Sequence, residues 1–288
     1  MYTTAFDYYR PQSLAEALTL LRAHPDAKVL AGGHSLLPAM KLRVSQPVAL
    51  VDIGRLPGLA GITAAGGALK IGALTTHAAV AASDVVRAQC ALLAQTAAQI
   101  GDQQVRNRGT LGGSLAHADP AADYPTTILA LDATLHAAGP GGERTVPASA
   151  FFTGLLSTAL QADELLIAVS VPVYGRGTGG AYLKHPHPAS GYAVAGAAAR
   201  VTVAGGKVTQ VSLAIGGVTV NPVRAAAAER ALAGQAPSDA AIVAAAAKAA
   251  EALRDPLSDN YASGDYRIHL ATVLAKRALT QAAARAQA

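Results

Sequence analysis

Two short segments, each running into a Gly-Gly pair, place the tightest constraint on how this chain can fold. The first is Leu30-Ala31-Gly32-Gly33-His34-Ser35-Leu36-Leu37, and the second is Arg108-Gly109-Thr110-Leu111-Gly112-Gly113-Ser114. Paired glycines permit positive φ and let the backbone approach a ligand without a β-carbon in between. Ser35 is placed to cap a short helix whose first turn tolerates Pro38. We therefore expect free backbone N–H groups at both bends, an arrangement suited to a diphosphate.

Simple turns remain the alternative explanation for both glycine pairs. The hydroxyls of Thr110 and Ser114 add donors at the second pair and favour the phosphate interpretation. The first pair lacks the third glycine of a G-x-G-x-x-G motif, and no Lys-Ser/Thr follows it as in a P-loop. Ser35 does not lie in a G-x-S-x-G nucleophile elbow. The two segments therefore predict a nucleotide site of another kind.

The surrounding pattern predicts an α+β fold. We expect a helix over 13–23, with Ser13 as N-cap and Glu16 completing a capping box. Expected strands and helices follow at 28–31 (strand), 49–53 (strand), 69–73 (strand), 85–100 (helix), 135–139 (hairpin arm) and 165–173 (strand). A glycine-rich stretch at 174–180 is interpreted as a domain boundary, which gives domains 1–175 and 176–288. The second domain is expected to hold a hairpin of 192–203 with 207–216 and alanine-rich helices over 223–233, 239–253 and 266–286.

Candidate polar residues cluster just after the second glycine pair. Asp119-Pro120 predicts a helix start, with Asp119 as the cap and Pro120 at the first position. Asp123, close to a glycine turn, could accept hydrogen bonds from the hydroxyls of a ribityl or ribose chain. A metal site made of His117, Asp119 and Asp123 is disfavoured, because no helical or strand register brings the three side chains together.

Composition excludes several classes of protein. Hydrophobic residues make up 51% of the chain, much of it alanine, and aromatic residues only 4%, which predicts tightly packed helices. The net charge of +5 is scattered along the sequence, which argues against nucleic acid as a partner. Cys90 is the single cysteine, so this chain alone forms neither an internal disulfide nor a four-thiolate iron–sulfur or zinc site. We find no signal peptide and no apolar run of the roughly 18 residues a membrane span requires, and we expect a cytoplasmic protein.

The two glycine segments resemble the paired FAD signatures of the medium subunit of carbon monoxide dehydrogenase and its relatives, including the flavin domains of xanthine dehydrogenases and aldehyde oxidoreductases. The likeness extends to Phe6-Asp7-Tyr8, to residues 38–43 and to residues 100–107, and it covers essentially the whole chain. It implies a two-lobed FAD-binding domain of the vanillyl-alcohol-oxidase or PCMH type, with a lobe boundary near 55–60. A small antiparallel sheet with a C-terminal helical layer would follow.

The resemblance also implies a function and a set of partners. A large subunit with a molybdenum–pterin cofactor oxidises the substrate of such enzymes, a small subunit carries two [2Fe–2S] clusters, and the medium subunit passes electrons through FAD to an external acceptor. The assembly is expected to be a dimer of heterotrimers, hence a heterohexamer. No catalytic acid–base pair and no metal are expected in this chain.

Residue by residue, the resemblance assigns the diphosphate and adjoining flavin to residues 30–37 and to Thr110, Gly112, Gly113 and Ser114. It places Ile100 along the flavin site and His117 and Asp123 near the ribityl or ribose hydroxyls. It sets Leu160, Lys184 and Tyr192 beside the isoalloxazine ring, with Lys184 as the residue that tunes its charge. A surface lysine and a tyrosine that anchors a strand are the structural alternatives for the last two.

Two departures from the family pattern bear on function. The second pair ends in Ser114 where many relatives have Asn, which leaves one side-chain hydrogen bond open. Residues 184–192 differ from the Lys-Gly-Asp-Tyr-like stretch of true carbon monoxide dehydrogenases and look closer to xanthine- and aldehyde-type relatives, so the substrate stays open. The alternative functions are a self-sufficient oxidase of the vanillyl-alcohol-oxidase type and a non-catalytic assembly subunit.

Overall fold

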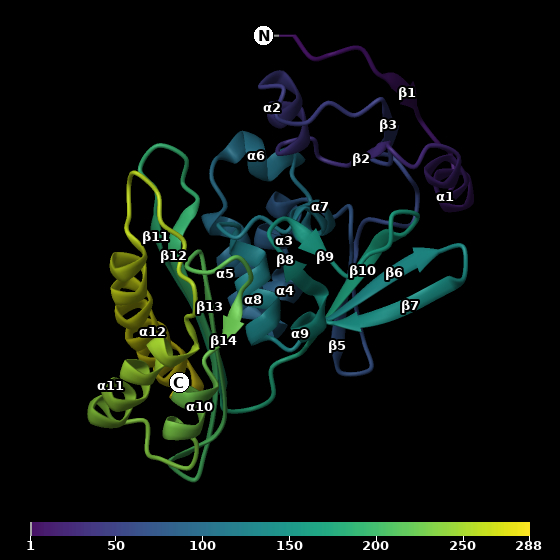
Figure 1. The fold of residues 1–288 in the computed structure, drawn as a ribbon. Coiled ribbons are helices and arrows are strands. Elements are labelled where there is room, and N and C mark those ends of the chain that lie inside the picture. Colours follow the sequence, from purple (N-terminus) through teal and green to yellow (C-terminus); the bar gives the residue numbers. More distant parts are fainter. Residues whose placement is uncertain (1) are drawn as a thin grey trace.

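A small parallel sheet opens the chain in the computed structural model, which describes residues 2–288 (Figure 1). Its strand order is β1-β3-β2, and helix α1 packs on it through Ala17 and Leu21. The elements of this part are β1 (Asp7–Tyr9), α1 (Leu14–Ala23), β2 (Lys28–Leu30), α2 (Leu36–Lys41) and β3 (Ala49–Asp52).

The capping residues of α1 act as the sequence predicts. The Ser13 hydroxyl accepts a hydrogen bond from the Glu16 N–H at 3.1 Å. The Glu16 carboxylate in turn accepts from the N–H of Gln12 at 2.7 Å, one residue before the cap. These two bonds satisfy amides that the first helical turn leaves without partners.

A second, five-stranded antiparallel sheet follows, with strand order β4-β5-β10-β6-β7. Short helices and one two-stranded ribbon cover it and build the largest apolar core of the molecule. These elements are β4 (Ile62–Ala65), β5 (Ala68–Gly72), α3 (His77–Ala82), α4 (Asp84–Gln89), α5 (Ala91–Gln99), α6 (Gln103–Arg108), α7 (Leu111–His117), α8 (Asp123–Ala130), β6 (Thr134–Gly139), β7 (Gly142–Pro147), α9 (Ala148–Phe151), β8 (Phe152–Gly154), β9 (Ser157–Thr158) and β10 (Leu165–Pro172).

Two helix predictions in this region are wrong. The single helix expected over 85–100 is two helices, α4 and α5, separated at Cys90, whose φ of −155° is not helical. The apolar spacing continues through the break because residues of both helices face one core, so the pattern could not reveal it. The helix expected at Asp119 begins instead at Asp123, and Asp119 accepts a hydrogen bond from the Ala121 N–H in a turn.

The C-terminal part is a four-stranded antiparallel sheet of order β11-β12-β13-β14, covered on one face by helices. Figure 1 shows α10, α11 and α12 on that face and α5 and α8 on the opposite side. The elements are β11 (Thr178–Pro186), β12 (Ala193–Ala204), β13 (Lys207–Gly216), β14 (Val223–Arg224), α10 (Ala226–Leu232), α11 (Asp239–Ala247), η1 (Lys248–Ala252) and α12 (Gly264–Gln287).

Strand β11 was not predicted, because its first residues, Gly179 and Gly180, were interpreted as part of a linker. A β-carbon on Gly179 would collide with the backbone oxygen of Ala282 in α12. Gly179 therefore allows the backbone of α12 to approach strand β11 closely, so the glycines here belong to a strand and not to a loop. Residues 184–186 are the last residues of β11.

Small residues hold α8 against the other face of the C-terminal sheet. Residues 193–199 of β12 are all buried and consist of alanine, valine and glycine. A β-carbon on Gly216 of β13 would collide with the hydroxyl of the fully buried Thr126 in α8. The alanine-rich composition thus serves close helix–sheet packing, and the predicted α+β class is confirmed. No helix among residues 2–288 is both long and apolar enough to cross a membrane.

Candidate functional site

The two glycine segments are in direct contact. A β-carbon on Gly32 would collide with the carbonyl oxygen of Arg108 and lie 2.8 Å from the Cα of Gly109. One built on Gly113 would lie 3.7 Å from the β-carbon of Ala31. The first segment follows strand β2 and the second connects helices α6 and α7, and they meet because neither carries a side chain at the contact. This convergence is the geometry that the sequence predicts.

The first glycine loop, residues 31–36, presents a row of unused backbone donors. Within residues 2–288, the N–H groups of residues 32–36 donate to no protein oxygen. The turn depends on Gly33, whose φ is +77°. Ser35 stands at the start of α2, but its hydroxyl does not cap the helix and stays available. Successive free N–H groups of this kind form a concave binding surface for an anion.

The second glycine segment differs from the prediction. The N–H of Leu111 donates to Thr75, and that of Gly112 to Ala73 at 2.8 Å. The N–H of Gly113 donates to the Thr110 hydroxyl at 3.0 Å, as an ordinary N-cap of α7. Free amides were expected here, and the structure shows that helix capping and a strand contact use them. To a ligand, this segment offers a close glycine surface, the Ser114 hydroxyl and the Arg108 side chain, not a row of free amides.

A cavity of about 160 Å³ lies against the first glycine loop. Its polar lining includes Arg55 and Arg108, and neither guanidinium pairs with a carboxylate in the part of the chain that the structure describes. Asp52 also lines the cavity, but its two oxygens accept from the Tyr8 hydroxyl (2.5 Å) and the Gly54 N–H (2.9 Å). That hydrogen bond raises the pKa of Tyr8. The cavity therefore carries two arginine charges against one carboxylate, a net positive charge beside free amides, which suits a diphosphate.

Sequence reasoning missed these two arginines, although both had a signal. Arg108 is the first residue of the second glycine segment, and Arg55 follows shortly after strand β3. Both therefore stand in or next to a feature that the sequence predicts. Without the contact between Gly32 and Gly109, however, nothing in the sequence brings them to one cavity.

Asp123 and Lys184 are joined to each other in a buried ion pair. Lys184 Nζ lies 2.9 Å from one Asp123 oxygen, and both side chains are 6% exposed. The Tyr182 hydroxyl donates to the other oxygen at 2.5 Å. Burial raises the pKa of Asp123, while the Lys184 charge and the Tyr182 hydrogen bond oppose that rise. The sequence assigned Asp123 to the sugar hydroxyls and Lys184 to charge tuning; in the structure the two side chains pair with each other, and both assignments stay predictions.

Tyr192 closes the site from the C-terminal part. It ends a turn over residues 187–192 and lies beside Ser35 of the first glycine loop. Burial is the main cause that raises the pKa of Tyr192, with further contributions from the charges of Asp119 and Asp123. The Ser35 side chain, which lies close by, acts in the opposite direction. The predicted site residues Ser35 and Tyr192, which lie far apart in the sequence, are thus brought together.

Three other predicted residues lie at the ends of elements. Ile100 follows α5, and its carbonyl accepts from Arg106 at 2.8 Å. His117 is the last residue of α7, and its side chain forms no hydrogen bond within residues 2–288. Leu160 lies half-buried between β9 and β10 against the main core. No hydrogen bond within residues 2–288 joins any of these side chains to the first glycine loop.

His77 lies directly behind the contact between the glycine segments. A β-carbon on Gly109 would lie 2.5 Å from its Nε2. The ring is 4% exposed, and its Nδ1 has no partner within residues 2–288. Burial, with smaller contributions from His34 and Arg106, lowers the pKa of His77 to about 4. The imidazole is therefore neutral at physiological pH.

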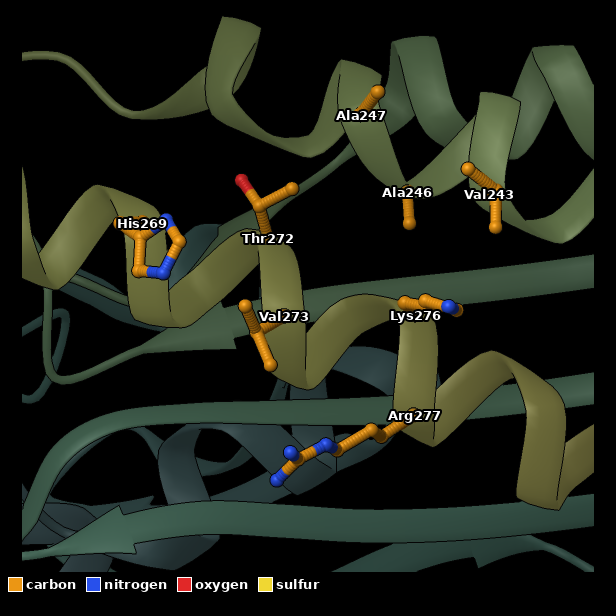
Figure 2. Close-up of a pocket in the computed structure, with 8 residues that line it drawn as sticks. All are labelled: Val243, Ala246, Ala247, His269, Thr272, Val273, Lys276 and Arg277. Atoms are coloured by element: carbon orange, nitrogen blue, oxygen red, sulfur yellow. The ribbon is translucent and has the colours of Figure 1, made fainter.

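A larger cavity, of about 380 Å³, lies elsewhere, between α11 and α12 (Figure 2). Its lining is mainly apolar, with Lys276 and Arg277 on one side. It lacks the combination of free amides and glycine backbone found at the smaller cavity. A search by cavity volume alone would have selected this cavity, and not the smaller one beside the glycine loop, as the candidate nucleotide site.

The fold, the contact between the glycine segments and the row of free amides are features of a dinucleotide-binding protein. Residues 4–174 match the family model of the FAD-binding domain in molybdopterin dehydrogenases, and residues 180–282 match the C-terminal domain of the CO dehydrogenase flavoprotein. The chain therefore belongs to the FAD-carrying medium subunits of the molybdenum hydroxylase family. The free amides and the glycine contact, which any side chain would fill, fit this cofactor.

Similar proteins span several substrates. The chain is 42% identical to the carbon monoxide dehydrogenase medium chain of Hydrogenophaga pseudoflava, with 99% of each chain covered. It is 32% identical to the xanthine dehydrogenase FAD-binding subunit of Escherichia coli O157:H7, over 97% of this chain and 96% of that one. A solved structure of carbon monoxide dehydrogenase from H. pseudoflava matches with a TM-score of 0.96 at 43% identity, covering 99% of both chains. Over the whole chain, identity is therefore higher to the carbon monoxide dehydrogenase medium chain than to the xanthine dehydrogenase subunit. The pattern of residues 184–192 alone looks closer to xanthine- and aldehyde-type relatives.

Proposed function

We propose that the first glycine loop and the two arginines beside it hold the FAD diphosphate. The observation that carries this proposal is the row of five free N–H groups at residues 32–36. Arg55 and Arg108 add two charges that have no carboxylate partner in the described residues. Glycine and Ser114 from the second segment, with Ile100, His117, Leu160 and Tyr192, complete the proposed cradle. Asp123 and Lys184 pair with each other, and in this proposal they act on the cradle only through neighbouring residues.

Bound FAD supplies the redox chemistry of this subunit, and the protein supplies binding, orientation and electrostatics. The amides of residues 32–36 fix the diphosphate without any side-chain rearrangement. Ser35 and Tyr192 hold the edge where the two parts of the chain meet. No group in this chain needs to take a proton from an organic substrate, because the substrate is oxidised elsewhere in the assembly.

We further propose the chain's place in that assembly. Its single cysteine is buried and uncharged, with a pKa raised to about 12 by burial, so an iron–sulfur cluster must be carried by another chain. We propose a small [2Fe–2S] subunit as electron donor and a large molybdopterin subunit as the site of substrate oxidation. We also propose a dimer of such heterotrimers, located in the cytoplasm, and a division of this chain into domains 1–175 and 176–288. Family membership favours this relay over a self-sufficient oxidase.

The diphosphate assignment is tested by Arg108→Gln in the assembled complex. The change removes a charge-assisted contact, which is worth about 1.5–3 kcal/mol, so the dissociation constant of FAD should rise by roughly ten- to a hundredfold. Flavin absorbance after gel filtration and titration of the stripped complex with FAD measure it. Arg87→Gln is the matched control, because Arg87 is exposed and makes only local contacts, a 3.6 Å pair with Asp84 and a hydrogen bond to the Ala81 carbonyl. Equal FAD retention in both variants would remove Arg108 from the site.

A further inference from the structure

The buried pair Asp123–Lys184 connects the two parts of the chain at a point that the electron-relay function does not explain. Asp123 is the first residue of α8, whereas Tyr182 and Lys184 are two residues apart on β11 and share one side of that strand. Both Asp123 oxygens are engaged, one by each of these residues. Because the ammonium and the carboxylate neutralise each other, the pair contributes little net charge to its surroundings.

Lys184 has a second contact, which leads toward the cofactor site. Its Nζ donates to the carbonyl oxygen of Gly191 at 2.8 Å. Gly191 lies inside the turn closed by two backbone hydrogen bonds, His187 N–H to Tyr192 O (2.7 Å) and Gly191 N–H to His187 O (2.8 Å). Its φ of +72° suits a glycine. The lysine thus holds the turn from its inner side, one residue before Tyr192.

The sequence is adapted to let the Tyr182 phenol reach Asp123. Gly196 on β12 is the cross-strand partner of Lys184. A β-carbon at Gly196 would lie 2.7 Å from the Tyr182 hydroxyl oxygen. Tyr182 is fully buried and contacts no residue of the glycine segments through its hydroxyl. Its hydrogen bond orients the carboxylate so that the other oxygen faces Lys184.

We propose that Tyr182, Asp123 and Lys184 form a positioning unit that fixes the 187–192 turn and so holds Tyr192 against Ser35 over the FAD site. Tyr182 and Lys184 are positioning residues, which act on the cofactor through Tyr192. The order of action is Tyr182 to Asp123, Asp123 to Lys184, Lys184 to Gly191, and Gly191 to its neighbour Tyr192. This inference rests on the proposed location of FAD beside Ser35 and Tyr192.

The chain contains a closely matched control for Tyr182. Tyr124 follows Asp123 on α8, is also fully buried, and its hydroxyl has no partner within residues 2–288. Tyr182→Phe and Tyr124→Phe therefore remove the same atom from equally buried rings, but only the first breaks a hydrogen bond to Asp123. Both changes preserve ring packing, so both variants should fold.

The experiment compares FAD release from the complete three-subunit complex carrying each variant. The rate at which flavin fluorescence appears after dilution should rise about three- to tenfold in Tyr182→Phe, the size expected when one hydrogen bond to a charged group acts at second hand. Tyr124→Phe should release FAD at the wild-type rate. Lys184→Met should resemble or exceed Tyr182→Phe. Equal release from the two tyrosine variants would overturn the proposal.

A double variant distinguishes positioning from a general loss of stability. If Tyr182 acts through Tyr192, then Tyr182→Phe added to Tyr192→Ala should not increase FAD release beyond that of Tyr192→Ala alone. Additive effects would show that Tyr182 acts by another route and would contradict the proposal. If the Tyr192→Ala complex retains FAD as fully as the wild-type complex, the proposed location of FAD beside Tyr192 is wrong.

Discussion

At the scale of single residues, the proposed cofactor site depends on positions that carry no β-carbon. Gly32 and Gly109 bring two distant segments together because neither has a β-carbon, and the free amides of the first glycine loop are exposed by a turn at Gly33. The side chains of Arg55, Arg108 and Tyr192 then add to this backbone surface; within residues 2–288, neither arginine pairs with a carboxylate. A substitution that adds a single methyl group should therefore damage the site more than loss of a polar group.

Gly32→Ala is expected to abolish FAD retention in the assembled complex. Its added methyl group would collide with the backbone oxygen of Arg108, which cannot move without displacing the second segment. Gly175→Ala is the control, because a β-carbon there meets nothing within 4 Å and requires no unusual backbone conformation. Bound flavin per complex, measured by absorbance, gives the result. Full flavin content in Gly32→Ala would show that the segments need not touch.

His77 should make the protein sensitive to acid. Its pKa is about 4 in the folded chain and 6.5 in an exposed histidine, so between these values only the unfolded chain binds the proton. Stability from this residue is complete above pH 6.5 and falls by about 1.4 kcal/mol per pH unit as the pH drops toward 4. In His77→Gln this part of the slope should disappear. Denaturant titrations of both proteins at several pH values measure it, and identical slopes would contradict the assigned burial effect.

At the scale of elements, periodicity and capping residues identified most of the regular structure. The sequence predicted α1 with its capping box, the strands β2, β3, β5 and β10, and the β12–β13 hairpin, because each is a local pattern of apolar and cap residues. It missed β11 and the break at Cys90, because both are decided by packing partners far away in the chain. The convergence of the glycine segments was predicted, whereas the use of the second segment's amides was not. Whether an N–H is free depends on Ala73 and Thr75, which no motif includes.

The end of α8 carries a cluster of charges that joins it to the C-terminal sheet. Asp132 follows α8 with a φ of +53° and contacts Arg200 at 2.7 Å and Arg224 at 2.5 Å, on strands β12 and β14. Arg224 also pairs with Glu229 of α10 at 2.6 Å. One carboxylate therefore connects three elements.

Asp132→Asn should lower the free energy of unfolding by about 1 kcal/mol, a value reduced because the Asp132 side chain is half exposed. Asparagine tolerates the same backbone conformation, so the change isolates the charge. Asp84→Asn is the control: Asp84 is almost fully exposed and should change stability by less than about 0.5 kcal/mol. Denaturant titration measures both, and equal effects would mean that the cluster contributes nothing.

At the scale of the whole molecule, the chain is a cofactor carrier that works between other subunits. Supplied with FAD but without partners, it should oxidise no organic substrate, because no side chain in the site is placed to activate one. The assembled complex, offered the same carbon monoxide, aldehyde and purine panel, serves as the positive control. Dye reduction followed by absorbance measures turnover. Turnover by the chain alone would refute the relay and support a self-sufficient oxidase.

Because the proposed FAD site includes both Ser35 and Tyr192, it also bears on the stage of synthesis at which the protein can bind its flavin. Ser35 leaves the ribosome early, whereas Tyr192 emerges only after most of the chain has been made, followed by the helices that support β11 and β12. If FAD lies beside Ser35 and Tyr192 as proposed, a growing polypeptide has no complete site for it. We therefore expect the flavin to be inserted only after the C-terminal part has been made and folded.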